Sequence, residues 1–213
     1  MSPTEDLRSL IAFASRLEEL KKIERFKGQF YWRDYPTLPR YESVADHSWR
    51  LAMFVLIVAP RLSRPFDLAR ALRMALVHDI PEIVTGDASP MGEDGMGKQS
   101  HAFNEDVKQS KHEREKIAAK AFFAGLPDLG DELFALWLEC EEQQTYEARV
   151  VKALDKVECM LQVGEYRQGH MFPAHLEFTI TYGTKDADVD PAVRALADSI
   201  ATDLKEKYWP FEN

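Results

Sequence analysis

Apolar residues recur along this chain at the spacing of one helix face, and this periodicity limits the possible fold more than any other feature. The pattern at the N-terminus is set by Leu7, Leu10, Ile11, Ala14, Leu17 and Leu20. It follows the i, i+3, i+4, i+7 rhythm of a helix with one buried face, for which Thr4 is a suitable cap. Further helices are expected over residues 44–59, 67–78, 108–125, 129–142, 146–168 and 191–208. Residues 176–182 alternate like a strand but have no partner strand, so we expect a helix or an irregular segment there. The sequence therefore predicts an all-α fold, a compact globule of many helices.

Local signals mark where several of these helices begin and end. Ser43 and Asp46 have the Ser-x-x-Asp form of a helix start, and the helix that follows is expected to stop at Pro60. The middle of this helix is apolar nearly all round, which predicts a central position in the core. Pro81 disfavours helical geometry at the preceding residue and favours a short new helical turn, which Gly86 would end. The aromatic-rich stretch 26–40 is expected to be an irregular connection.

The stretch 88–107 combines three glycines with few apolar residues. A structureless segment of about 20 residues is unusual inside a compact domain, and it is typical of a lid or a disordered insertion. At 213 residues the chain has the length of one large domain or two small ones. We expect a single domain over 1–213, with a flexible loop or lid at 88–107.

Charge and composition exclude several classes of protein. Lysine and arginine total 27 against 36 acidic residues, which gives a formal net charge of −9 and argues against binding a nucleic-acid polymer. No apolar run reaches the ~18 residues of a membrane span, and the N-terminus lacks a secretory signal core. Cys140 and Cys159 form no Cys-x-x-Cys pair, so we expect reduced thiols in a cytoplasmic protein. A small anionic substrate in a locally positive pocket stays possible.

Ionisable residues lie in or beside four apolar segments. They are His47, then His78 with Asp79, then Glu82 with Asp87, and finally Asp155. Burying a bare charge costs several kcal/mol unless it is paired or binds a metal. Two imidazoles and two carboxylates are a suitable mixed ligand set for a divalent ion.

Each of these residues has a simpler interpretation when it is considered alone. His47 suits a hydrogen-bonded core histidine, Asp155 a solvated helix pair with Lys156, and Glu82 an acid favoured by the helix dipole. The combination and its order favour a metal site.

The ordered segments resemble the HD-domain (His-Asp) metal-dependent phosphohydrolases, and most closely their 5′-deoxynucleotidase branch. The segments that carry the resemblance are 42–48 (ESVADHS), 75–82 (ALVHDIPE), 85–87 (TGD), 147–148 (EA) and 151–156 (VKALDK), within a match from about Leu10 to Tyr166. The resemblance implies an all-helical globule that forms a homodimer.

The resemblance also implies roles for particular residues. One divalent ion (Zn, Mn, Co or Mg) would be ligated by His47, His78, Asp79 and Asp155. Glu82 would act on the attacking water, and Asp87 would lie beside the substrate sugar and the catalytic centre. In members that resemble two-metal enzymes, a second ion would be held by Glu82, Asp87 and the backbone of Ala88. Arg25 would bind phosphate, and Phe26 would crowd the 2′ position of the sugar.

The expected function is metal-dependent hydrolysis of deoxynucleoside 5′-monophosphates, with a small-molecule nucleotide as the substrate. Two alternatives stay open. One is another HD-domain phosphohydrolase that acts on phosphodiesters or pyrophosphates. The other is a non-catalytic helical dimerisation module with a structural metal, against which the presence of Glu82 and Asp87 argues because a purely structural site needs neither.

Overall fold

The computed structural model describes residues 3–33, 40–167 and 171–208, and within these ranges the regular structure is helical. Apart from the helices, these ranges contain one isolated antiparallel bridge, between Glu24 and Ser43. The α-helices are α1 (Pro3–Arg16), α2 (Val44–Val58), α3 (Leu68–Val77), α4 (Glu82–Thr85), α5 (Glu105–Phe123), α6 (Gly130–Glu141), α7 (Tyr146–Tyr166), α8 (Pro173–Thr184) and α9 (Pro191–Tyr208). Short 3-10 helices are η1 (Leu17–Lys21), η2 (Phe30–Trp32), η3 (Ala59–Arg61) and η4 (Ala187–Val189). The predicted all-α class is confirmed, and the segment 176–182 is helical within α8.

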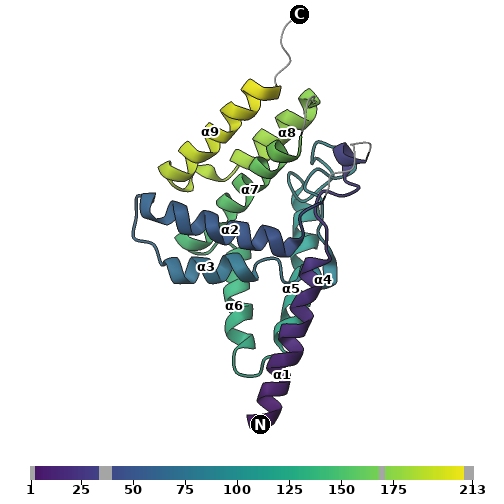
Figure 1. Ribbon diagram of the computed structural model, residues 1–213, viewed down its shortest axis with the longest axis vertical. Helices are drawn as coiled ribbons and strands as arrows, with labels where there is room; N and C mark the ends of the chain where they lie inside the picture. The colour runs from purple at the N-terminus through teal and green to yellow at the C-terminus, as the bar shows by residue number, and fades with distance from the viewer. Residues whose placement is uncertain (1–2, 34–39, 168–170, 209–213) are drawn as a thin grey trace, which may run out of the picture.

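Helix α7 is the element around which the others are arranged (Figure 1). Helices α2, α3, α6, α8 and α9 all contact it. More than half of its residues are buried, including Val150, Val151 and Leu154, which are fully covered. Burial of this kind stabilises a helix far more than its intrinsic propensity does. Side chains on α7 therefore have fixed positions relative to all of its neighbours.

The predicted boundary signals are confirmed where they bear on the site. The Ser43 hydroxyl accepts from the backbone N–H of Asp46, and the Asp46 carboxylate accepts from the backbone N–H of Ser43, so both halves of the capping box form. The Asp67 side chain also caps α3, which was not predicted, by accepting from the backbone N–H of Arg70 at 3.0 Å. Gly86 ends α4 with a φ of 74°, a left-handed conformation that favours glycine.

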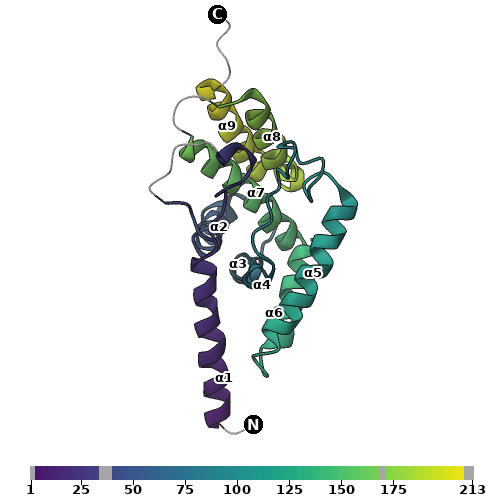
Figure 2. The same ribbon diagram turned by 90° about the vertical axis from the view of Figure 1, so that its right-hand side faces the viewer.

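Helix α1 differs from the prediction of a buried face. Figure 2 shows it extending away from the other helices, and Leu7, Leu10 and Ile11 are all more than half exposed. The contact with the body of the protein runs instead through Phe13, whose ring packs against Phe122 and Phe123 of α5. The helix begins at Pro3, one residue before Thr4, which was expected to precede it. The apolar pattern predicted the helix correctly but not what covers it.

Helix α2 is also less central than its composition indicates. One side, with Val44, Leu51 and Val55, is completely buried against neighbouring helices. The opposite side leaves Trp49 65% and Ile57 53% exposed. The predicted central position therefore holds for one face of α2, which packs mainly against α3 and α7, and not for the opposite face.

The segment between Gly86 and α5 contains no long helix, as expected, but it has more anchors than its composition indicates. Met91 and Ala102 are almost fully buried. A Cβ atom on Gly95 would lie 2.5 Å from the Phe30 ring, so this backbone approaches the aromatic side chain as only glycine allows. Arg33 forms an ion pair with Glu93. These contacts hold the segment against residues 28–33, and its role as a lid stays a prediction.

The packing of α8 on α7 generates a stability prediction. A Cβ atom on Gly183 would lie 2.7 Å from the Cβ atom of Met160, a rigid part of that side chain. We expect Gly183→Ala to lower the free energy of unfolding by about 1–3 kcal/mol, although alanine is the better helix former. Urea denaturation measures the change.

Gly164→Ala is the matched control for this prediction. Its added Cβ would meet only the end of the Leu204 side chain, at 2.6 Å, and that end can rotate away. A smaller loss of stability is expected for Gly164→Ala. An equal or greater loss in the control would contradict the close α7–α8 packing.

Candidate metal centre

His47 lies in the first turn of α2, where the capping box begins the helix beside α7. Its imidazole is completely buried. The Nδ1 atom lies 2.6 Å from a carboxylate oxygen of Glu158, which is also completely buried. A carboxylate only accepts hydrogen bonds, so Nδ1 carries the hydrogen and Nε2 faces the interior of the protein.

His78 and Asp79 follow α3 directly, at the turn that Pro81 imposes. The Nδ1 atom of His78 lies 3.0 Å from the carbonyl oxygen of Ala75, and it therefore also carries the hydrogen. The indole N–H of Trp137 donates to the His78 carbonyl at 2.9 Å and holds the backbone of this turn. Both histidines thus direct Nε2 toward the carboxylates.

Four predicted ligands from three separate segments converge at this point. Nε2 of His47 lies 3.1 Å from a carboxylate oxygen of Asp155 and 3.7 Å from one of Asp79. Nε2 of His78 lies 3.1 Å from the same Asp79 oxygen. The two imidazole rings have centroids 5.4 Å apart. The structure therefore brings together His47, His78, Asp79 and Asp155, although they are separated by more than a hundred positions along the chain.

The donor chemistry of this cluster fits a divalent cation. Neither Nε2 atom makes a hydrogen bond of acceptable geometry, and both are buried. In a neutral ring with the hydrogen on Nδ1, Nε2 presents a lone pair toward carboxylate oxygens, which is repulsive unless a proton or a metal ion lies between them. Neutral imidazole nitrogens and carboxylate oxygens are the ligands that zinc and similar ions take.

The pKa values of the cluster indicate the same need for positive charge. Burial and the Arg25 guanidinium lower the pKa of His47, but Glu158 and Asp155 outweigh them and raise it to about 10. Burial raises the pKa of Asp79, but His78 and His47 outweigh it and hold the pKa below its usual range. The pKa of Asp155 is likewise lowered by His47 and Lys152 against the effect of burial. A proton on His47 supplies part of the positive charge that these carboxylates need. A divalent ion bound between the side chains would supply positive charge to all of them.

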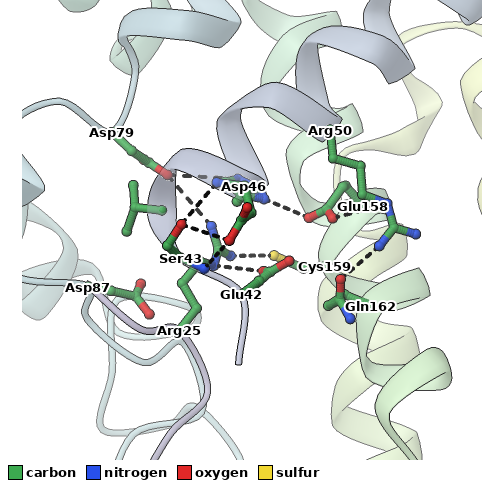
Figure 3. A network of polar contacts seen from close by, with 12 residues as sticks. Arg25, Glu42, Ser43, Asp46, Arg50, Asp79, Asp87, Glu158, Cys159 and Gln162 are labelled. Carbon is green, nitrogen blue, oxygen red and sulfur yellow. Dashed lines mark hydrogen bonds and ion pairs between the residues drawn. The ribbon is translucent and has the colours of Figure 1, made fainter. Parts of the chain in front are cut away.

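Arg25 lies against this cluster because the bridge between Glu24 and Ser43 aligns it with the start of α2 (Figure 3). Its backbone N–H donates to the carbonyl of Glu42 at 2.9 Å. The guanidinium lies 3.2 Å from the Glu42 carboxylate and 3.6 Å from that of Asp79. It also donates to the sulfur of Cys159 at 2.8 Å. A fixed guanidinium beside a ligand carboxylate is well placed to bind a phosphate group at the same point.

Glu82 and Asp87 lie in the segment that follows His78 and Asp79. Glu82 is the first residue of α4, and Asp87 directly follows Gly86. Burial, together with Asp79 and Asp87, raises the pKa of Glu82 well above its usual value, and its Oε2 atom has no hydrogen-bond partner. Burial also raises the pKa of Asp87, although Arg25 opposes this. In the described part of the chain neither carboxylate joins a close group of three ligand atoms. The second ion at Glu82, Asp87 and Ala88 therefore stays a prediction.

Phe26 lies next to Arg25 and adopts a φ of 66°, which non-glycine residues rarely do. Its ring packs edge-on against Trp32 and Tyr166, with centroids 5.8 Å and 5.6 Å away. This packing holds the ring in one orientation beside the cluster.

A cleft of about 570 Å³ opens onto these residues. Its lining includes Arg25, Asp79, Glu82, Asp87 and Asp155. It also includes lysines, of which Lys152 pairs with Glu141 and Lys156 with Asp186, each at 2.7 Å. These two lysines are partly neutralised by carboxylates, as is Arg25 by Glu42 and Asp79, so a bound cation would add to the attraction for an anionic ligand in this cleft.

Sequence reasoning missed three residues that contact the cluster. Glu158 orients His47, Glu42 pairs with Arg25, and Cys159 lies within 4.8 Å of ligand atoms on His47 and Asp155. Glu158 lies three positions after Asp155, so both side chains share one face of α7. That spacing is the one signal in the sequence that points to Glu158. Both cysteines are free, as expected.

Known proteins share sequence and fold with this chain. The 5′-deoxynucleotidase HDDC2 of Homo sapiens is 36% identical over 172 residues, which cover 80% of this chain and 74% of that protein. The 5′-deoxynucleotidase YGK1 of Saccharomyces cerevisiae is 30% identical over 155 residues, which cover 70% and 63% of the two chains. A crystal structure from Magnetospirillum magnetotacticum MS-1, titled a predicted metal-dependent phosphohydrolase, has a TM-score of 0.68 at 24% identity. It covers 95% of this chain and 97% of that one, and it shows the shared fold.

An all-helical fold that gathers two histidines and two aspartates in this order defines a class of metal-dependent hydrolases. The chain belongs to the HD domain family, whose model matches residues 17–197. The family resemblance stated from the sequence is confirmed.

The contact between Glu158 and His47 generates a prediction about metal affinity. Carboxylates that orient a ligating imidazole typically contribute about 10- to 100-fold to metal binding. We expect Glu158→Gln to raise the Kd for zinc by about that factor, because the amide accepts the Nδ1 hydrogen without the negative charge. Competition with a chelating dye measures the Kd.

Glu165→Gln is the matched control on the same helix, because Glu165 is exposed and pairs with Arg50 at 2.7 Å. Its Kd for zinc should stay within about twofold of the wild-type value. A normal zinc affinity in Glu158→Gln would remove Glu158 from the metal centre.

Proposed function

We propose that this chain is a metal-dependent phosphomonoesterase that hydrolyses deoxynucleoside 5′-monophosphates to the deoxynucleoside and inorganic phosphate. The observation that carries the proposal is the pair of buried Nε2 atoms on His47 and His78, both without a hydrogen-bond partner and both facing carboxylates. The names of the curated relatives support the substrate class.

The proposed ligands of the ion are His47, His78, Asp79 and Asp155. When bound, the ion acts as a Lewis acid that makes hydroxide available near neutral pH and offsets charge on the phosphate. The rest of the proposed mechanism depends on side chains that surround this point.

Arg25 binds the phosphate in this proposal and orients it for in-line attack. Its guanidinium is already held by Glu42 and Asp79, so little conformational entropy is lost when a phosphate oxygen replaces part of this contact. Asp87 accepts a hydrogen bond from a sugar hydroxyl, which an ionised carboxylate is suited to do. The Phe26 ring excludes a 2′-hydroxyl by occupying the space that it would need.

Glu82 is the proposed proton carrier. Glu82 lines the cleft, its buried Oε2 atom has no hydrogen-bond partner, and burial together with Asp79 and Asp87 raises its pKa well above the usual value, which favours the protonated form. A carboxyl group of this kind can orient the attacking water and pass a proton to the departing sugar oxygen.

We also propose a homodimer and a cytoplasmic location. Exposed apolar side chains on α2, including Trp49 and Ile57, support pairing with a second copy. Two free thiols support a reducing compartment. In the described residues no helix is both long and apolar enough to cross a membrane.

Phosphate release from a panel of substrates tests the function. The panel contains deoxynucleoside monophosphates, a phosphodiester and a pyrophosphate, each with and without added zinc, manganese, cobalt or magnesium. We expect phosphate to be released only from the monophosphates and only when metal is present. Preferred cleavage of the diester or the pyrophosphate would favour another HD-domain phosphohydrolase, and metal binding without any hydrolysis would favour a structural module.

Glu82→Gln separates binding of the metal from the chemistry. We expect the variant to keep wild-type metal content and to lose about 10²–10⁴ in kcat, which is the usual contribution of a general acid or base. Elemental analysis and phosphate release measure the two quantities. Loss of the primary ion would make Glu82 a ligand, whereas loss of only a second, weaker ion would support the two-ion arrangement.

Phe26→Leu tests how the sugar is selected. An apolar wall discriminates modestly, so we expect the wild type to prefer dCMP to CMP by about 10–200-fold in kcat/KM. Leucine leaves room beside the sugar, and the preference should fall toward equality in the variant. The ratio of the two rates is insensitive to a general loss of activity. An unchanged ratio would mean that Phe26 does not select the sugar.

A further inference from the structure

A second, smaller cavity, here called the His175 cavity, lies beside the phosphate-binding Arg25. Arg25, Asp87 and Cys159 line both this cavity and the large cleft, so the two spaces meet at the proposed sugar site. The rest of its wall is mainly apolar and includes Phe26, Met91, Met160, Val163, Phe178 and His175. A group attached to the sugar would thus enter an apolar space with few polar atoms, as is usual for small-molecule sites.

His175 is the most constrained polar group of this wall. It is completely buried in α8, and its ring stacks on Tyr31 with a centroid distance of 4.3 Å and an interplanar angle of 12°. Trp32 packs edge-on against the same ring at 5.6 Å. The imidazole therefore has one orientation.

The tautomer of His175 is also determined by its surroundings. A guanidinium nitrogen of Arg167 lies 3.2 Å from Nδ1, and the same nitrogen donates to the carbonyl of Tyr31 at 2.6 Å. A guanidinium only donates hydrogen bonds, so Nδ1 accepts and the hydrogen resides on Nε2. Burial lowers the pKa of His175 to about 3, with a further contribution from Arg167, so the ring is neutral. Nε2 is a buried donor without a partner.

Gln29 supplies the complementary group. Its amide nitrogen lies 3.5 Å from Asp87, which leaves Oε1 as an acceptor, and that atom is buried without a partner. Gln29 also lines the His175 cavity. One fixed donor and one acceptor in an apolar cavity match a flat heterocycle that carries both a carbonyl and an N–H group.

The size of the His175 cavity limits the ring that it can hold. Its volume is about 40 Å³. At roughly 10–15 Å³ for each water this corresponds to about three water molecules, which is comparable to one six-membered ring and less than two fused rings.

We propose that the His175 cavity binds the base of a pyrimidine deoxynucleotide, with the Nε2 hydrogen of His175 donated to a carbonyl oxygen of that base. The inference rests on the proposed function for the position of phosphate and sugar, and it adds the substrate class. His175 is a specificity-determining residue that takes no part in the chemistry. A base without a carbonyl group at this position would leave the buried Nε2 hydrogen of His175 unpaired, which disfavours the complex.

Kinetics on substrates with and without a base test this assignment. The substrates are dCMP, dAMP and 2-deoxyribose 5-phosphate, which keeps the sugar and the phosphate but has no base. The wild type should prefer dCMP to dAMP by at least about tenfold in kcat/KM. His175→Phe removes the donor at similar volume and should lower kcat/KM for dCMP by about 10- to 100-fold. Hydrolysis of 2-deoxyribose 5-phosphate should stay within about twofold, because it does not use the cavity.

His175→Gln is the matched variant, because its amide can accept from Arg167 and still donate into the cavity. It should recover most of the activity on dCMP. Equal losses on dCMP and 2-deoxyribose 5-phosphate in His175→Phe would overturn the proposal, and so would wild-type rates on dAMP that match those on dCMP.

Binding distinguishes a failure of this inference from a failure of the proposed function. Deoxycytidine is titrated into the metal-loaded wild type and both variants by calorimetry, which does not require hydrolysis. Weaker binding to His175→Phe, with recovery in His175→Gln, would support the base site even if no substrate is cleaved. Equal affinity for all three proteins would overturn it.

Discussion

The hydrogen bond between His47 and Glu158 is the contact on which the centre depends. An imidazole and a carboxylate, both fully buried, are each costly alone and stable together, so α2 has one favourable register on α7. Asp155 lies three residues before Glu158 on the same face of α7, and it therefore meets the opposite side of the same imidazole. One face of one helix thus fixes both the orientation of the histidine and one of the carboxylates toward which it points.

Signals that act between near neighbours in the chain were predictable from the sequence. The capping box at Ser43 and the turn from Pro81 to Gly86 both form as expected, because each requires only residues within five positions. The order of histidines and aspartates was equally informative, since buried ionisable residues must find partners. The structure brings them together, and the family model spans all of them.

Contacts between distant segments were not predictable in the same way. Periodicity identified α1 and α2 as helices but did not reveal which faces would be covered, because a pattern contains no information about the partner. Arg167 and His175 illustrate the same limit. Nothing local indicates that a guanidinium will face an imidazole nitrogen, yet this contact decides which nitrogen of His175 carries the hydrogen. The glycines at 95 and 97 suggested looseness in the sequence, whereas in the structure they permit close approach to Phe30 and Phe178.

The projection of α1 from the body of the protein has a consequence for how the chain opens. Its amides are covered by few tertiary contacts, mainly through Phe13, whereas α7 packs against α2, α3, α6, α8 and α9 and more than half of its residues are buried. The free energy needed to open a helix with so little buried area is a small fraction of the free energy of global unfolding. In a monomer, the backbone hydrogens of α1 would therefore exchange with deuterium much sooner than those of α7. If the leucine-bearing side of α1 meets a second copy, that exchange becomes slower as the protein concentration rises, so α1 reports assembly without any change at the metal centre.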